Sequence, residues 1–160
     1  MDPQQLYHDS IIIDGLNVSN WNSPGVFDNL RTGNITAISA TVATWENFLQ
    51  TMDHLSSWTR RFQHRSDIHQ IHTVADILAA KKADKTGIIL SFQNASPVEN
   101  DLERFALFHA IGVRIIQLTY HERNLLGNGC FERRDEGLSN FGIDAVRTMN
   151  ELGILIDLSH

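Results

Sequence analysis

The stretch GLSNFGIDAVRTMNELGILIDLSH, residues 137–160, decides the fold of this chain. Ser139 is a typical helix N-cap, and the apolar residues after it recur at three- and four-residue spacing. Gly153 follows the last of them, so the spacing predicts an amphipathic helix that ends at this glycine. Ile154–His160 is then an apolar run with a polar end, as expected for a buried strand. A helix that leads directly into a buried strand is half of a strand–helix–strand unit, and such units form parallel sheets.

The composition is that of one globular domain, residues 1–160. Hydrophobic residues make up 42% and charged residues 20% of the sequence, which is enough apolar surface for a core. The net charge of −6 argues against a nucleic-acid partner, because binding to phosphates requires a basic face. Cys130 is the only cysteine, no secretory signal is visible, and no apolar run approaches the ~20 residues of a membrane span. These features predict a cytoplasmic protein that binds neither nucleic acid nor membrane.

Four further strands are predicted upstream of residue 137. Each is a short run of β-branched and aliphatic residues with a polar or turn-forming end: Ser10–Leu16, Asn34–Ala43, Thr86–Asn94 and Val113–His121. Apolar periodicity and capping residues predict helices at Trp45–Arg65, Val74–Ala83 and Pro97–Ala110. Loops are expected at Asn17–Arg31 and Glu122–Glu136, and a short extended piece at Ile68–His72.

Each strand turns polar at its carboxyl end. The residues at these ends are Asn17, Gln93, Asn94, Tyr120, His121 and His160. In α/β barrels and in open α/β sheets, this edge is where sites are built. No glycine-rich phosphate-binding motif follows any strand, which disfavours a Rossmann or P-loop protein. About five strands do not close a barrel, which takes eight strands and about 250 residues, so two hydrophobic edges would be left open.

Four motifs resemble one family, in the same order along the chain. They are IIIDGLN at 11–17, VENDLERFALFHAIGVR at 98–114, GVRIIQLTYHERNLLGNG at 112–129 and the stretch at 137–160. This series is similar to the membrane (renal) dipeptidase family, peptidase family M19. The resemblance implies an α/β fold, the N-terminal part of a (β/α)₈ TIM barrel of the metallo-dependent-hydrolase type. It also implies a zinc metallopeptidase activity, in which two cations activate a shared water for the hydrolysis of dipeptides.

Carried over residue by residue, the resemblance places most of the family's metal-ligand positions on poor ligands. Leu16 and Val18 stand where the first strand of the family has a histidine and an aspartate. Gln93 stands at the position of a bridging glutamate. His160 matches the histidine of the D-x-S-H motif, and the next ligand histidine of the family lies beyond it. Zinc, the cofactor of the family, is therefore not expected to bind stoichiometrically to this chain alone.

The candidate substrate-binding residues are Tyr120, Gln93 and Asn124, and no residue is assigned as catalytic. Tyr120 replaces a family histidine near the substrate, and because strand residues alternate faces, His121 is expected to point away from the site. Gln93 either orients a ligand or satisfies loop backbone, and Asn124 either helps to hold a carboxylate or lies in a surface loop. His160 is a metal ligand, a general base or a strand-end histidine without either role.

Three other polar side chains receive structural interpretations. Asp14 is expected to accept hydrogen bonds from loop amides. Asp157 is expected to be a hydrogen-bonded structural carboxylate, because it faces the other side of its strand from His160. Cys130 has no base near it in the sequence and is interpreted as a passive thiol.

The sequence supports three hypotheses of function. In the first, the chain is the N-terminal part of a dipeptidase-like hydrolase, incomplete and inactive alone, whose substrate is a dipeptide-like small molecule. In the second, it is a non-catalytic half-barrel that covers its open edges by forming a homodimer or by pairing with a separate C-terminal half. In the third, it hydrolyses another amide or an ester with an altered site.

Overall fold

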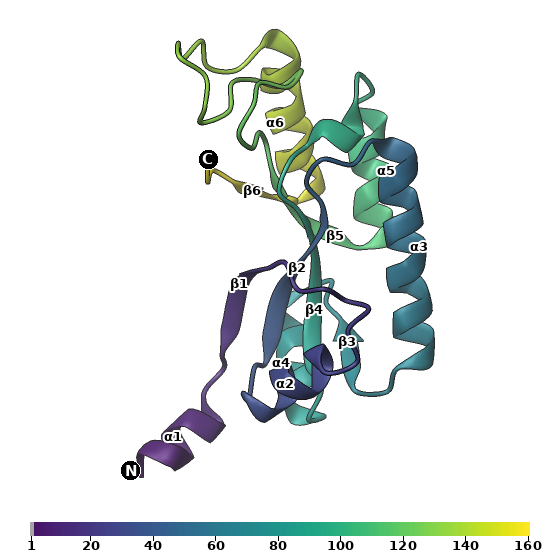
Figure 1. Cartoon of the computed structure of the whole chain (residues 1–160), viewed down its shortest axis with the longest axis vertical. Coiled ribbons are helices and arrows are strands. Elements are labelled where there is room, and N and C mark those ends of the chain that lie inside the picture. Colours follow the sequence, from purple (N-terminus) through teal and green to yellow (C-terminus); the bar gives the residue numbers. More distant parts are fainter. Residues whose placement is uncertain (1) are drawn as a thin grey trace.

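Helices and strands alternate along the chain in the computed structural model, which describes residues 2–160 (Figure 1). The strands are β1 Ile13–Asn17, β2 Ala37–Ala43, β3 Ile68–Gln70, β4 Thr86–Phe92, β5 Val113–Gln117 and β6 Leu155–Asp157. The helices are α1 Pro3–Asp9, α2 Val26–Thr32, α3 Phe48–His64, α4 Val74–Lys82, α5 Glu103–Ile111 and α6 Asn140–Leu152, with a 3₁₀ turn, η1, at Ser96–Val98.

The strands form one parallel sheet in the order β1-β2-β4-β5-β6. The remaining strand, β3, is not part of this series. It pairs with the first half of β4, whereas β5 pairs with the second half of β4. Helices α3 and α5 lie along one side of the sheet, and the edge strands β1 and β6 turn towards the other side (Figure 1). The predicted α/β fold, a partial barrel of parallel strands, is confirmed. The short extended piece expected at 68–72 is β3.

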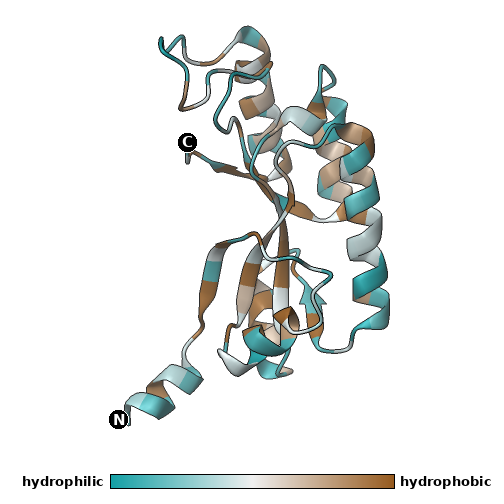
Figure 2. Cartoon of the chain, viewed as in Figure 1, coloured by the Kyte–Doolittle hydropathy of each residue, from teal (hydrophilic) through white to brown (hydrophobic). Residues whose placement is uncertain are grey.

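The core lies between the sheet and its helices, where β2 and β4, which carry several strongly hydrophobic residues (Figure 2), are buried along nearly their whole length. Phe92 of β4 and Phe108 of α5 meet edge to face with their ring centroids 4.9 Å apart, and each is at most 1% exposed. Trp58 of α3 is 2% exposed. Burying one such side chain contributes about 1.5–3 kcal/mol relative to leaving it in water.

The helix ends follow the local signals in the sequence. Thr73 and Asp76 form a capping box at the start of α4, and the hydroxyl of Ser139 accepts the N–H of Gly142 at the start of α6. Helices α5 and α6 end at Gly112 and Gly153, whose φ angles of 115° and 73° lie in the left-handed region. The caps expected at the start of α4 and α6 and the stop expected at Gly153 are therefore confirmed.

Three segments differ from the sequence-based expectation. The predicted loop at 17–31 contains α2, which no side chain caps and which exists because Phe27 is buried against the rings of Trp21 and Trp58. The helix predicted from Pro97 is broken: η1 ends at Val98, Glu99 has a φ of 54°, and α5 begins only at Glu103. In addition, α1 was not predicted.

The last two strands are shorter than predicted. Pairing between β5 and β6 ends with Gln117 opposite Asp157, not at His121 and His160. After Gln117, the backbone hydrogen-bonds to the loop before α6 and no longer to β6. The carbonyl of Tyr120 accepts a hydrogen bond from the N–H of Cys130 at 3.1 Å. The residues after β5 are thus released from the alternation of a pleated strand.

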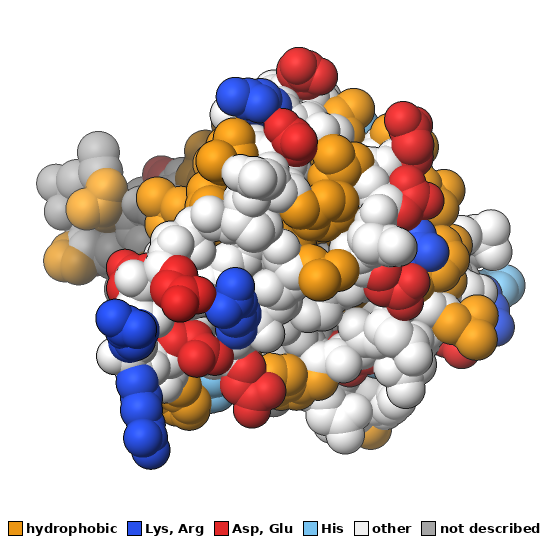
Figure 3. Space-filling model, turned by 90° about the horizontal axis from the view of Figure 1, so that it is seen from above, with side chains coloured by type: hydrophobic (Ala, Val, Ile, Leu, Met, Phe, Trp, Pro, Cys, Tyr) orange, Lys and Arg blue, Asp and Glu red, His pale blue; other side chains and the backbone are white. Residues whose placement is uncertain are grey.

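The surface of the protein carries both charged and apolar side chains. Seen from above, acidic and basic side chains are interspersed with apolar ones (Figure 3). Large exposed side chains on or next to the edge strands include Ile13, Val18, Leu155 and Leu158. Within residues 2–160, no helix combines the length and the hydrophobicity needed to cross a membrane.

Candidate functional site

A cluster of aromatic and imidazole rings lies at the carboxyl end of the sheet. The ring centroid of Tyr120, after β5, is 4.0 Å from that of His121 and 4.4 Å from that of His160, which follows β6. Trp45, after β2, packs edge-on against Tyr120 at 5.2 Å, and Phe131 stacks on His121 at 4.2 Å. Segments that are distant in the sequence therefore meet at the edge where α/β folds build their sites.

The prediction that Tyr120 and His121 point to opposite faces is wrong. Both residues lie beyond Gln117, the last residue of β5, so strand alternation does not apply to them. Their ring planes are 21° apart, and both rings lie near His160, at 4.4 and 5.3 Å between centroids. His121 therefore belongs to the ring cluster, although the sequence analysis placed it outside.

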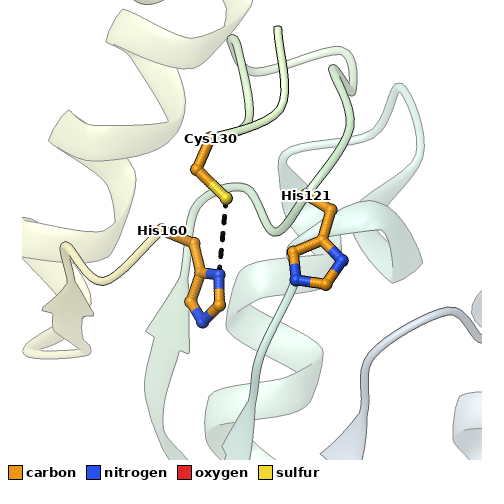
Figure 4. A group of neighbouring side chains, drawn as sticks. All are labelled: His121, Cys130 and His160. Atoms are coloured by element: carbon orange, nitrogen blue, oxygen red, sulfur yellow. Dashed lines mark hydrogen bonds between the residues drawn. The ribbon is translucent and has the colours of Figure 1, made fainter.

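Cys130 also has a neighbour that the sequence does not reveal. Its Sγ lies 3.6 Å from Nδ1 of His160 (Figure 4). A ring nitrogen of His121 completes a group of three ligand atoms that all lie within 4.8 Å of one another. The expectation that no base lies near this thiol is thus corrected. Thirty residues separate Cys130 from His160 in the chain, so spacing alone carries no signal of the contact.

Gln93 and Asn94, directly after β4, are buried and hydrogen-bonded within the protein. Gln93 is 5% exposed, and its Nε2 donates to Oγ1 of Thr41 at 3.0 Å, which connects the end of β4 to β2. Oδ1 of Asn94 accepts from the N–H of Ser96 at 3.1 Å and from Nδ2 of Asn124 at 2.8 Å. The Gln93 side chain thus binds a side chain of β2 and not loop backbone, and a direct contact with substrate stays a prediction.

Asn124 organises the loop between β5 and α6. Besides its bond to Asn94, Nδ2 donates to the carbonyl of Leu118 at 2.7 Å. Its Oδ1 accepts from the N–H groups of Leu126 and Gly127 at 2.7 and 3.2 Å. The side chain therefore joins the loop to the ends of two strands. Its role as a substrate-binding residue stays a prediction.

A separate cavity of about 370 Å³ lies beside the end of β2, between the β1–α2 loop and α3. Its polar lining groups have partners in the protein: His54 Nδ1 lies 2.8 Å from the carbonyl of Val42, and Arg61 donates to Oδ1 of Asn22 at 2.7 Å. Burial lowers the pKa of Arg61 below its usual value. This cavity has no signal in the sequence, because three non-adjacent segments form it.

Comparison with known proteins relates this architecture to one family. The model of membrane dipeptidases, peptidase family M19, matches residues 4–160. The chain belongs to this family. An amidohydrolase from Pseudomonas aeruginosa has a solved structure that matches with a TM-score of 0.96 and 41% identity, over 100% of this chain and 49% of the other.

Matches at lower sequence identity include another solved structure and a curated relative. The probable dipeptidase PvdM from Pseudomonas aeruginosa matches with a TM-score of 0.82 and 19% identity, over 98% of this chain and 48% of the other. The dipeptidase tcpJ of Claviceps purpurea is 26% identical over 120 residues, which are 74% of this chain and 28% of that protein. The chain thus spans about half the length of the two solved structures and about a quarter of the curated relative.

Leu16 and Val18, which the resemblance places at first-strand ligand positions, have hydrocarbon side chains. Leu16 is 48% exposed and Val18 is 67% exposed. The carboxylate of Asp14, in β1, is hydrogen-bonded to residues near it in the chain. It accepts from the N–H of Leu16 at 3.2 Å and from Nδ2 of Asn17 at 2.9 Å. Asp157 likewise accepts the N–H of Ser159 at 2.8 Å. Asp157 is a hydrogen-bonded carboxylate, as predicted. Asp14 is also hydrogen-bonded, but its donors belong to β1 and not to a loop.

Proposed function

We propose that this chain forms the substrate-facing N-terminal strands of an M19 hydrolase that acts on a dipeptide-like amide. The family match over residues 4–160 carries the proposal. The ring cluster at the carboxyl edge of the sheet supports it, because (β/α) folds bind substrates at this edge. Tyr120 is the residue proposed to contact the substrate, with Gln93 and Asn124 behind it. A cytoplasmic location stays a prediction, made from the single cysteine and from the lack of a recognisable secretory signal or long apolar run in the sequence.

The two-zinc centre implied by M19 membership does not fit the side chains of residues 2–160 at the family's positions. Leu16 and Val18 have no donor atoms. Gln93 is a neutral amide whose nitrogen is directed at Thr41. Among these positions only His160 offers a ligand of the usual kind, whereas a pair of cations requires several imidazoles and carboxylates. No two-metal step follows from these residues, and the proposed contribution of the chain is to bind and orient the substrate.

Dipeptide binding by the purified chain tests this proposal. The chain has two tyrosines, so NMR of labelled tyrosine distinguishes Tyr120 from Tyr7, which lies in α1. We expect added dipeptides to shift the Tyr120 signals and free amino acids to leave them unchanged. The variant Tyr120→Ala should lose dipeptide binding, and Tyr7→Ala is the matched control. Absence of any dipeptide-dependent shift at Tyr120 would contradict the proposal.

Hydrolysis and metal content form the second part of this test. We expect the chain alone to release no amino acids from dipeptides, with or without added zinc, and to hold fewer than two zinc ions. The physical reason is that Leu16 and Val18 supply no ligand atoms for a pair of cations. Dipeptide turnover together with two bound zinc ions per chain would refute this view of the site.

Self-association is a second candidate function, and the edges of the sheet favour it. Strands β1 and β6 are the ends of the strand order. They and their flanks expose apolar side chains, such as Leu155 at 63% and Leu158 at 83%. Exposed hydrophobic edges pair readily with other strands. We propose that a second copy of the chain, or the C-terminal strands of a barrel, covers them.

Light scattering after gel filtration measures this association. A dimer that dissociates in the variant Leu155→Lys supports pairing between copies. Leu78→Lys, at a position 54% exposed on α4, is the matched control and should leave the dimer intact. A monomer at every concentration would exclude the homodimer and leave covering by C-terminal strands as the remaining arrangement.

A further inference from the structure

Three metal-binding side chains from three segments face one another at the carboxyl edge of the sheet (Figure 4). His121 follows β5, Cys130 lies in the loop before α6, and His160 follows β6. One ligand atom from each lies within 4.8 Å of the other two. Sγ of Cys130 and Nδ1 of His160 are 3.6 Å apart.

These separations are close to those around a tetrahedral metal ion. With zinc–nitrogen bonds of about 2.1 Å and zinc–sulfur bonds of about 2.3 Å, a tetrahedral angle places the sulfur and nitrogen about 3.6 Å apart. The distance between Cys130 and His160 already has this value. All three atoms lie within 4.8 Å of one another, so the third ligand atom, from His121, needs to move by at most about 1.5 Å to reach the same geometry.

The backbone holds the thiol beside the histidines. The N–H of Cys130 donates to the carbonyl of Tyr120 at 3.1 Å, and that of Phe131 donates to the carbonyl of His121 at 2.9 Å. Gly129 permits this close approach, because a Cβ atom there would collide with the carbonyl oxygen of His121. The loop is thus fastened to the very segment that carries one of the histidines.

The histidines are positioned by their own neighbours. The His121 ring lies between those of Tyr120 and Phe131, at 4.0 and 4.2 Å between centroids, which limits its rotation. Before His160, the chain turns where Oδ1 of Asp157 accepts the N–H of Ser159 at 2.8 Å. A site whose ligands are held in this way loses less conformational entropy when a metal binds.

We propose that His121, Cys130 and His160 bind one zinc ion. A thiolate and two imidazoles form a donor set that suits Zn²⁺ and does not suit Mg²⁺ or Ca²⁺, which prefer oxygen. Three protein ligands leave one tetrahedral position for a water molecule or a ligand atom. His160 is the only member that the M19 resemblance assigns to a metal, so this mononuclear site differs from the family's two-metal centre. The inference does not depend on the proposed function.

Cobalt spectroscopy tests the site directly. The purified chain is freed of metal with a chelator and titrated with Co²⁺, whose bond to a thiolate produces charge-transfer absorption. We expect saturation at one equivalent and loss of the absorption when Zn²⁺ displaces the cobalt. A chromophoric chelator in competition then measures the zinc affinity. Removing a residue that only hydrogen-bonds to a metal ligand typically lowers metal affinity by about 10–100-fold. We therefore expect Cys130→Ser and His121→Gln, which remove ligands, each to weaken zinc binding by about tenfold or more.

Matched variants make the result decisive. His64→Gln, at an exposed position at the end of α3, should keep the wild-type affinity. Circular dichroism verifies that each variant is folded. If a variant does not fold, the cobalt spectrum of the unaltered chain still shows whether Cys130 binds the metal. Absence of thiolate–cobalt absorption in the unaltered chain would overturn the proposal. So would zinc binding that is lost in His160→Gln and unchanged in Cys130→Ser and His121→Gln. Neither result bears on dipeptide binding at Tyr120.

Discussion

Replacing Asn124 with alanine removes the side chain that ties the β5–α6 loop to the ends of β4 and β5. Its Nδ2 donates to the carbonyl of Leu118 and to Oδ1 of Asn94, at 2.7 and 2.8 Å. Its Oδ1 accepts from the N–H groups of Leu126 and Gly127, at 2.7 and 3.2 Å. Leu118, Asn94 and Leu126 are at most 9% exposed, so water does not readily replace the lost partner.

The magnitude follows from these four hydrogen bonds. Each contributes a net of about 0.5–1.5 kcal/mol, and a buried group left without a partner costs about 1–3 kcal/mol. Part of the loop can relax and admit water, which lowers the sum. We therefore expect the free energy of unfolding to fall by about 2–4 kcal/mol, a large share of the about 5–15 kcal/mol of a typical domain.

Urea unfolding, followed by circular dichroism, measures this change. With an m-value of about 2 kcal/mol per molar urea, the midpoint should fall by about 1–2 M. The control is Asn128→Ala in the same loop, because Nδ2 of Asn128 makes one hydrogen bond, to the carbonyl of Arg134 at 2.6 Å. If Asn124→Ala shifts the midpoint no further than Asn128→Ala does, Asn124 does not fasten the loop.

Three further predictions concern stability. Gly142→Ala should lower the melting temperature by several degrees, because the added Cβ would collide with the carbonyl oxygen of Leu126; a melting curve like that of the wild type would contradict this close packing. Phe108→Ala should cost about 3–5 kcal/mol in urea unfolding, since the ring is fully buried between two other phenylalanines, and a loss below about 1 kcal/mol would show that the site is not tightly packed. Asp67→Asn should cost about 1 kcal/mol or less at neutral pH, because the hydrogen-bonded Arg65 lowers the pKa of Asp67 below its usual value. A lowered pKa means that the charged carboxylate stabilises the folded chain above about pH 4, so the difference from wild type should vanish as pH falls through the folded pKa, and a pH-independent difference would refute the ion-pair explanation.

Local sequence signals were sufficient for most of the secondary structure. The apolar runs of β2 and β4, the capping box at Thr73 and the glycines after α5 and α6 act over a few residues, so they can be recognised without the fold. The helix α2 could not be recognised in this way. It has no capping side chain, and it is stabilised by the burial of Phe27 against aromatic rings from α3 and the β1–α2 loop.

The sequence by itself determined the alternation of strands and helices, the parallel sheet and the polar carboxyl edge at which His160 lies. Only the tertiary structure decided which side chains meet there. His121 joins Tyr120 because β5 ends at Gln117, and Cys130 reaches His160 because backbone hydrogen bonds fold its loop back onto the residues after β5. The physical reason is the distance along the chain over which each kind of signal acts. Periodicity and capping act between neighbours in the chain, whereas a site is assembled by contacts between segments tens of residues apart.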